Sequence, residues 1–159
     1  NLLTAFLGAW VIGRFEDTIQ QLVALAILMP VVAGMGGIAG SQTLTIAIRG
    51  IALGHIAKTN IKPLLIKELS IGILNGIFWS SVVAIIVILW FGQFSLGIII
   101  GASMMINLII AALAGATIPI ILKHYGIDPA IAGGVILTTV TDVVGFITFL
   151  GLATIFLIG

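Results

Sequence analysis

Asp142 is the only acidic or basic residue in the apolar stretch from Pro129 to Gly159. At about 1.5 Å per helical residue, it lies roughly 20 Å from Pro129, close to the middle of a bilayer. An ionisable side chain at that depth costs on the order of 3 kcal/mol or more, and it usually marks the path of an ion or a proton. Asp142 is therefore the first candidate for chemistry in this chain.

Oxygen-bearing side chains flank Asp142. Thr138 lies one helical turn before it, so the carbonyl or hydroxyl oxygen of Thr138 shares the face of the carboxylate. Thr139 and Thr141 belong to the same polar run. A carboxylate with oxygen donors stacked beside it suits a hard cation. No Lys, Arg or His lies at matching depth, so either a cation neutralises Asp142 or it stays protonated. The alternative interpretation is a protonated Asp that holds helices together through hydrogen bonds.

A second candidate is the glycine-rich segment from Gly34 to Gly40. Glycines at positions 34, 36, 37 and 40 weaken a helix and expose backbone carbonyls. Such backbone is tolerated at membrane depth only where it lines water or is covered by protein. Close helix packing through Gly36 and Gly40 is the alternative, and both interpretations can hold at once. Two further spaced glycine pairs, Gly72 with Gly76 and Gly97 with Gly101, favour packing alone.

The composition indicates an integral membrane protein. The 159 residues are 61% hydrophobic and 7% charged, whereas soluble domains carry about 25% charged residues. The net charge of +1 is too small to indicate a nucleic-acid partner, and the absence of cysteine excludes disulfides and thiolate metal sites. No Ser–His pair lies at matching depth and no second carboxylate lies inside the membrane. We therefore expect neither an enzyme nor an organic cofactor.

The apolar segments predict an all-α polytopic protein with a single ion-conducting domain over residues 1–159. The predicted helices cover about 1–13, 22–48, 70–91, 95–122 and 129–158. The first is too short to span a bilayer, so we interpret it as the remainder of a longer helix and expect a cytoplasmic regulatory region before it. With that helix included, five crossings result.

The connecting segments set the orientation. Arg14 stands alone on one side, and the other basic residues fall on the opposite side, namely Arg49, Lys58, Lys62, Lys67 and Lys123. The positive-inside rule then places the N-terminus in the cytoplasm and the C-terminus outside. The polar segment from Gly50 to Leu69 is expected as a cytoplasmic connection that forms an interfacial helix near lipid head groups.

Two connections carry end signals for helices. Asp17 with Gln20 resembles a capping box for the second predicted helix. Gly126 is expected to close the fourth, and Asp128 and Pro129 to open the fifth. Glu16 and Asp17 are also candidates for gathering cations at an outer mouth, although an ordinary solvated loop is favoured over that role.

The charge of Asp142 bears on which ion it serves. One carboxylate supplies one negative charge, whereas a divalent ion carries two. A homodimer with its two-fold axis along a pore would bring two copies of Asp142 face to face and balance one divalent ion. Because Mg²⁺ loses water reluctantly, such a wide site suits a hydrated ion. This reasoning does not separate Mg²⁺ from Mn²⁺ or Ca²⁺.

Two long segments carry a resemblance to a known family. They are LMPVVAGMGGIAGSQTLTIAIRGIALG (Leu28 to Gly54) and GIDPAIAGGVILTTVTDVVGF (Gly126 to Phe146), supported by FEDTIQQLVALA before the first. With them the chain resembles the transmembrane domain of the MgtE family of magnesium channels or transporters. The resemblance implies a homodimer of five-helix subunits, a pore lined by the second and fifth helices, inward passage of Mg²⁺, and cytoplasmic CBS domains before the first helix.

The resemblance also assigns roles to residues. It implies that Asp142 recognises hydrated Mg²⁺ together with the carbonyl of Thr138. The implied pore-lining residues are Gly36, Gly37, Ile38, Gln42, Gly133, Gly134, Thr141 and Gly145. Two positions depart from the family pattern: Ile38 stands where an Asn is usual, and Val135 where a Pro is usual. Ile38 puts pore hydration, rate or gating in doubt.

We therefore expect a Mg²⁺ channel in the plasma membrane of a prokaryote. Its expected partners are a second copy of itself, membrane lipid, and Mg²⁺ or other divalent cations. Two alternatives stay open. The first is a proton-coupled or cation-exchanging transporter, and the second is a membrane assembly module that transports nothing.

Overall fold

The computed structural model describes residues 1–159 and is helical throughout, as predicted. In chain order, the elements are α1 (Leu2–Gly13), α2 (Glu16–Gln21), α3 (Ala24–Ala52), η1 (Lys58–Asn60), α4 (Ile61–Phe91), α5 (Phe94–His124), α6 (Pro129–Ala153) and η2 (Thr154–Ile158). Four segments, Ala24–Ala52, Lys58–Phe91, Phe94–His124 and Pro129–Ile158, are long and apolar enough to cross a membrane. The 12-residue helix α1 is shorter than the roughly 20 residues of a crossing, so a fifth crossing and the homodimer stay predictions.

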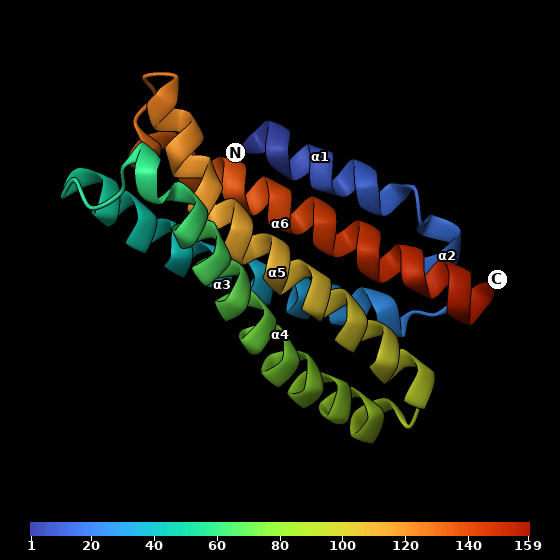
Figure 1. Ribbon diagram of the computed structural model, residues 1–159. Helices are drawn as coiled ribbons and strands as arrows, with labels where there is room; N and C mark the ends of the chain where they lie inside the picture. Colours follow the sequence, from blue (N-terminus) through green and yellow to red (C-terminus); the bar gives the residue numbers. More distant parts are fainter.

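Helix α5 is the centre of the bundle. It is buried at intervals from Leu96 to Leu122 and packs against α3, α4 and α6, while α1 lies along α6 (Figure 1). Buried side chains from α3, α5 and α6, such as Leu28, Met104 and Phe149, form the larger apolar cluster. A smaller cluster around Leu44 and Leu137 packs near the other end of these helices. Burial of this apolar surface against α5 fixes α3 and α6 relative to each other.

Small residues let α4 and α5 approach closely, as the sequence predicted. A Cβ on Gly72 would lie 2.9 Å from the Cβ of Ala112, and a Cβ on Gly101 would lie 3.3 Å from the Cβ of Ala84. Gly97 meets Ile88 in the same interface. The interpretation of these glycines as packing residues is confirmed.

The predicted end signals around α6 are confirmed. The Ala130 N–H donates to the Asp128 carboxylate at 3.0 Å, with Pro129 in the first turn. Gly126 has a φ of +73°, and the Ile127 N–H donates to the Leu122 carbonyl at 2.9 Å. This is the Schellman arrangement, which closes α5 with glycine in the left-handed conformation.

The predicted capping box at Asp17 is wrong. Asp17 lies inside the first turn of the short helix α2, and no side chain caps α2 or α3. Gln20 instead donates to Glu16 at 3.2 Å. Because the chain turns helical at Glu16 and breaks at Leu22, the Asp17 carboxylate is too early to reach the first amides of α3.

The segment from Gly50 to Leu69 also differs from the prediction. Helix α4 begins at Ile61 rather than near Ser70, so the part of the basic segment that holds Lys62 and Lys67 belongs to this long helix instead of a separate interfacial helix. Glu68 lies within α4 and is only 6% exposed. The Thr43 hydroxyl of α3 donates to its carboxylate at 3.5 Å. This contact with α3 lets a charged residue occupy the buried face of α4.

Candidate functional site

A groove of about 560 Å³ lies between α3 and α6. Helix α6 contributes Thr138 and Asp142, and α3 contributes a small and polar surface. The α3 residues that line it are Ala33, Gly34, Gly37, Ile38, Ser41, Gln42 and Thr45. Two segments distant in the chain thus share one cavity that contains the single carboxylate of α6.

Asp142 and Thr138 face the groove together, one turn apart on α6. The Thr138 hydroxyl donates to the Gly134 carbonyl at 3.0 Å, which leaves the lone pairs of its oxygen available as an acceptor. The Thr138 carbonyl accepts the Thr141 hydroxyl at 3.2 Å. None of the side-chain hydrogen bonds of the protomer engages Asp142, and its carboxylate makes no ion pair. The carboxylate oxygens are therefore free to receive a ligand.

The α3 wall of the groove is a continuous helical face. Gly34, Gly37, Ser41 and Thr45 recur every three or four residues, the spacing of one side of an α-helix. Helix α3 runs unbroken from Ala24 to Ala52, so its glycines do not unwind it. They open the groove because they carry no side chain.

The four glycines between Gly34 and Gly40 divide between two faces of α3. A Cβ on Gly34 or Gly37 would meet nothing within 4 Å, so these two border open space. A Cβ on Gly36 would clash with the amide of Asn107, and one on Gly40 would lie 3.0 Å from Leu137. The packing interpretation is therefore confirmed for Gly36 and Gly40, whereas Gly34 and Gly37 border the groove without weakening the helix.

Part of the predicted pore-lining set lies outside the groove. Gly133 and Gly145 are buried in the protomer, where a Cβ would lie 3.2 Å from Leu44 and 2.9 Å from Asn107, respectively. Gly36 faces Asn107, and Thr141 is fully buried. Gly134 is exposed beside Thr138 and borders open space. Of the predicted set, the structure thus gathers Gly37, Ile38, Gln42, Thr138 and Asp142 in the groove.

Glu16 and Asp17 do not line the groove. Both are exposed on α2, at the end of the molecule where the C-terminus lies (Figure 1). Their suggested role in gathering cations stays a prediction.

Asn107 is a buried polar residue on the central helix α5. It is 1% exposed, and its Nδ2 donates to the Val32 carbonyl of α3 at 3.0 Å. The same side chain fills the space left by Gly36 on α3 and Gly145 on α6. Asn107 therefore joins both walls of the groove to the central helix α5.

The groove contains one carboxylate, that of Asp142, and not a set of several metal ligands. No group of three or more His, Cys, Asp or Glu side chains lies close enough to hold a metal ion. The groove instead presents Asp142 with hydroxyl, amide and carbonyl oxygens, the ligand type of hard cations such as Mg²⁺. A fully dehydrated ion would need more ligands than this chain places there.

The amino-acid sequence of this chain is similar to those of known proteins. A family model described as MgtE, divalent cation transporter, matches residues 29–152. The chain belongs to the MgtE family. That family is one of transporters rather than enzymes, and the matched residues include most of α3, all of α4 and α5, and nearly all of α6.

Three curated relatives in the MgtE family, each named magnesium transporter MgtE, come from bacteria. The protein of Bacillus subtilis is 38% identical over 156 residues, which is 98% of this chain and 35% of the relative. Those of Enterococcus faecalis and Thermus thermophilus are each 30% identical over 96% and 98% of the chain, and 34% of their own length. This MgtE-family chain thus spans about a third of the length of its curated relatives, and it is a multi-pass membrane protein.

Proposed function

We propose that this MgtE-family chain forms the path by which Mg²⁺ crosses the membrane. The observation that carries the proposal is the exposure of Asp142 and Thr138 to a groove between α3 and α6, with no partner for the carboxylate inside the protomer. The names of the relatives give the ion, since all three are called magnesium transporters.

The active form in this proposal is a homodimer whose two grooves face each other. Two copies of Asp142 then supply two negative charges to one divalent ion. Gly34, Gly37 and Gly134 leave open space beside the acid, which is room for an ion that keeps part of its water. When the site is empty, the two carboxylates repel each other, so the ion stabilises the closed pair.

The direction of Mg²⁺ movement in this proposal rests on the distribution of basic residues and on the membrane potential. We infer from the positive-inside rule that the end of the molecule that holds Lys58 and Lys123 faces the cytoplasm, because most of the basic residues lie there. Each charge that crosses a potential of 100 mV gains about 2.3 kcal/mol, and a divalent ion gains twice that amount. Inward movement of Mg²⁺ through a channel therefore needs no second energy source.

The decisive variant is Asp142→Asn, which keeps the size of the side chain and removes its charge. We expect it to reduce Mg²⁺ uptake into proteoliposomes by at least tenfold, since charge-assisted contacts are roughly twice as strong as neutral ones. Thr139→Val is the matched control, because the Thr139 hydroxyl donates to the Val135 carbonyl at 2.7 Å and does not line the groove. Undiminished uptake by correctly folded Asp142→Asn protein would refute the proposal.

The same liposomes distinguish a channel from an exchanger. Uptake through a channel follows the Mg²⁺ gradient and the membrane potential and is indifferent to a pH gradient of either sign. Uptake that requires a proton gradient would instead support alternating protonation of Asp142.

A further inference from the structure

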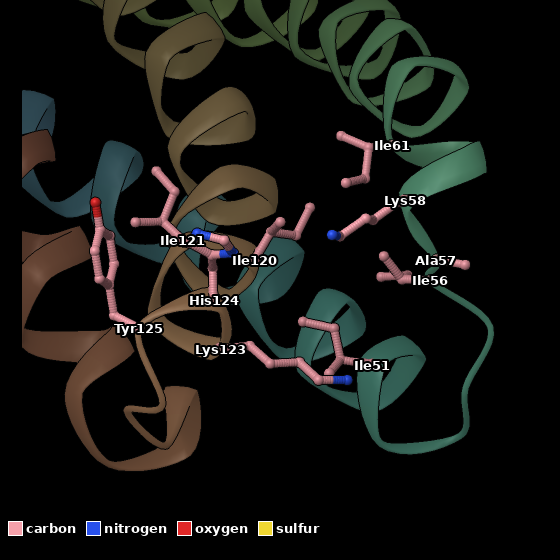
Figure 2. Close-up of a pocket in the computed structure, with 10 residues that line it drawn as sticks. All are labelled: Ile51, Ile56, Ala57, Lys58, Ile61, Ile120, Ile121, Lys123, His124 and Tyr125. Atoms are coloured by element: carbon pink, nitrogen blue, oxygen red, sulfur yellow. The ribbon is translucent and has the colours of Figure 1, made fainter.

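A second cleft, of about 660 Å³, lies at the end of the bundle opposite α2 (Figure 2). One wall is the last turn of α5, and the other consists of the end of α3 and the segment that joins α3 to α4. Figure 2 shows Lys58 extending from the joining segment towards α5, while Lys123 crosses from α5 to the end of α3 beside Ile51. Neither the groove of Asp142 nor the α3 glycines contribute to this cleft.

The walls of the cleft are built by local hydrogen bonds. The Asn60 side chain accepts from the Ala57 N–H and donates to the His55 carbonyl, both at 2.7 Å, which fixes the segment carrying Lys58. At the end of α3, Gly54 has a φ of +73° and the His55 N–H donates to the Gly50 carbonyl at 2.8 Å. With the same Schellman closure after Lys123 in α5, both lysines extend from ordered helix ends rather than from loose loops.

The lining combines positive charge with apolar side chains. No acidic residue lines the cleft, so the two ammonium groups have no carboxylate partner there. His124 adds a further nitrogen. Ile51, Ile61 and Ile120 make up much of the remaining surface. A ligand that contacts both the lysines and the isoleucines must carry an anionic group attached to a hydrocarbon chain.

We propose that this cleft binds the head group of an anionic phospholipid, with the phosphate between Lys58 and Lys123 and the first acyl carbons against the isoleucines. The position supports a lipid, because the cleft lies where the membrane-crossing segments α3 and α5 end and α4 begins. Basic pockets between transmembrane helices on the cytoplasmic side are recognised lipid sites. Free phosphate would use the lysines but leave the apolar walls uncovered.

Native mass spectrometry of the full chain in mild detergent tests the proposal, with dioleoyl phosphatidylglycerol and dioleoyl phosphatidylcholine as probes. We expect tight retention of phosphatidylglycerol and weak retention of phosphatidylcholine. Since each lysine near a lipid surface contributes about fivefold in binding, Lys58→Gln with Lys123→Gln should weaken phosphatidylglycerol binding by roughly twentyfold or more.

Matched variants separate this site from general attraction between charges. Lys62→Gln with Lys67→Gln removes the same charge from the neighbouring part of α4 outside the cleft and should leave binding unchanged. Ile61→Trp keeps both lysines and fills the apolar end, so it should weaken lipid binding but not phosphate binding.

Three results would overturn the proposal. Equal losses of phosphatidylglycerol binding in the two double-lysine variants would show that the lipid is attracted by overall positive charge and not by this cleft. Unaltered binding by Ile61→Trp would show that the lipid does not enter the cleft. Complete displacement of the lipid by inorganic phosphate would identify free phosphate as the ligand. The proposal does not depend on Mg²⁺ transport, and Asp142→Asn protein should bind the lipid as the unaltered chain does.

Discussion

Ile38 is the only large apolar side chain that lines the groove of Asp142, and it is 60% exposed. Its neighbours there are glycines, hydroxyls and an amide, which can contact the water shell of an ion. A branched hydrocarbon offers that shell no hydrogen bond and excludes the volume of several waters. At the residue scale, Ile38 is therefore the side chain best placed to limit the rate of ion passage.

Ile38→Asn should raise the rate of Mg²⁺ uptake severalfold, because an amide replaces hydrocarbon with a donor and an acceptor for bound water. Stopped-flow measurement with a Mg²⁺-sensitive dye inside liposomes gives the rate. Ile85→Asn is the control, since Ile85 is 57% exposed on α4 and lies outside the groove. An unchanged rate in Ile38→Asn would show that passage is limited elsewhere.

Single residues of the candidate site were predictable to different degrees. Asp142 was evident because a lone acid in an apolar stretch needs no structural context to be noticed. The division of the α3 glycines was not evident, because Gly36 and Gly37 are adjacent and identical in type. Only the rotation of α3 about its axis, set by Asn107 and Leu137, turns one toward α5 and the other toward the groove.

At the scale of elements, α3 and α6 are held by the same buried amide. Asn107 donates to the Val32 carbonyl at 3.0 Å, and its Oδ1 has no hydrogen-bond partner. An unpaired buried acceptor is costly, so this contact is retained at some expense to stability. The glycines on either side of the amide permit the close approach, and a methyl group at either would displace Asn107.

Gly36→Ala should therefore destabilise the protein, whereas Gly37→Ala should not. At Gly36, overpacking against Asn107 lowers the free energy of unfolding by about 1 to 3 kcal/mol. At both positions, the better helix propensity of Ala raises it by about 1 kcal/mol. The expected result is a lower melting temperature for Gly36→Ala and an equal or higher one for Gly37→Ala, measured by intrinsic fluorescence in detergent. Equal melting temperatures would contradict the assigned rotation of α3.

The ends of elements show why sequence reasoning succeeded at α6 and failed at α4. The signals for α6 are local, since Asp128 bonds to an amide two residues away. In α4, by contrast, Glu68 lies inside the helix, and its carboxylate accepts a hydrogen bond from Thr43, 25 residues earlier in the chain. Hydropathy alone treats Lys62, Lys67 and Glu68 as outside the membrane, although long lysine side chains can extend from a spanning helix to water.

At the scale of the whole molecule, one protomer does not enclose the ion path that we propose. The groove of Asp142 lies on the surface between α3 and α6, while the interior of the bundle is filled by α5 (Figure 1). A charged surface groove at mid-membrane is unfavourable against lipid. In the homodimer that we propose, a second copy would cover this face with its own Asp142 opposite, which would remove the carboxylates from lipid and complete the path.

Cysteine cross-linking tests this arrangement directly, because the chain contains no native cysteine. Ser41→Cys places a single thiol on the groove face of α3, and a short bis-maleimide should join two copies into a dimer that gel electrophoresis resolves. Leu89→Cys is the control, since Leu89 is exposed on α4, which packs against α5 rather than α6. Mg²⁺ held between the two carboxylates should draw the protomers together, so cross-linking of Ser41→Cys should increase with Mg²⁺ and lose that dependence when Asp142→Asn is added. Cross-linking through Leu89 but not through Ser41 would place the interface on α4 and leave the groove facing lipid, contrary to the proposed dimer.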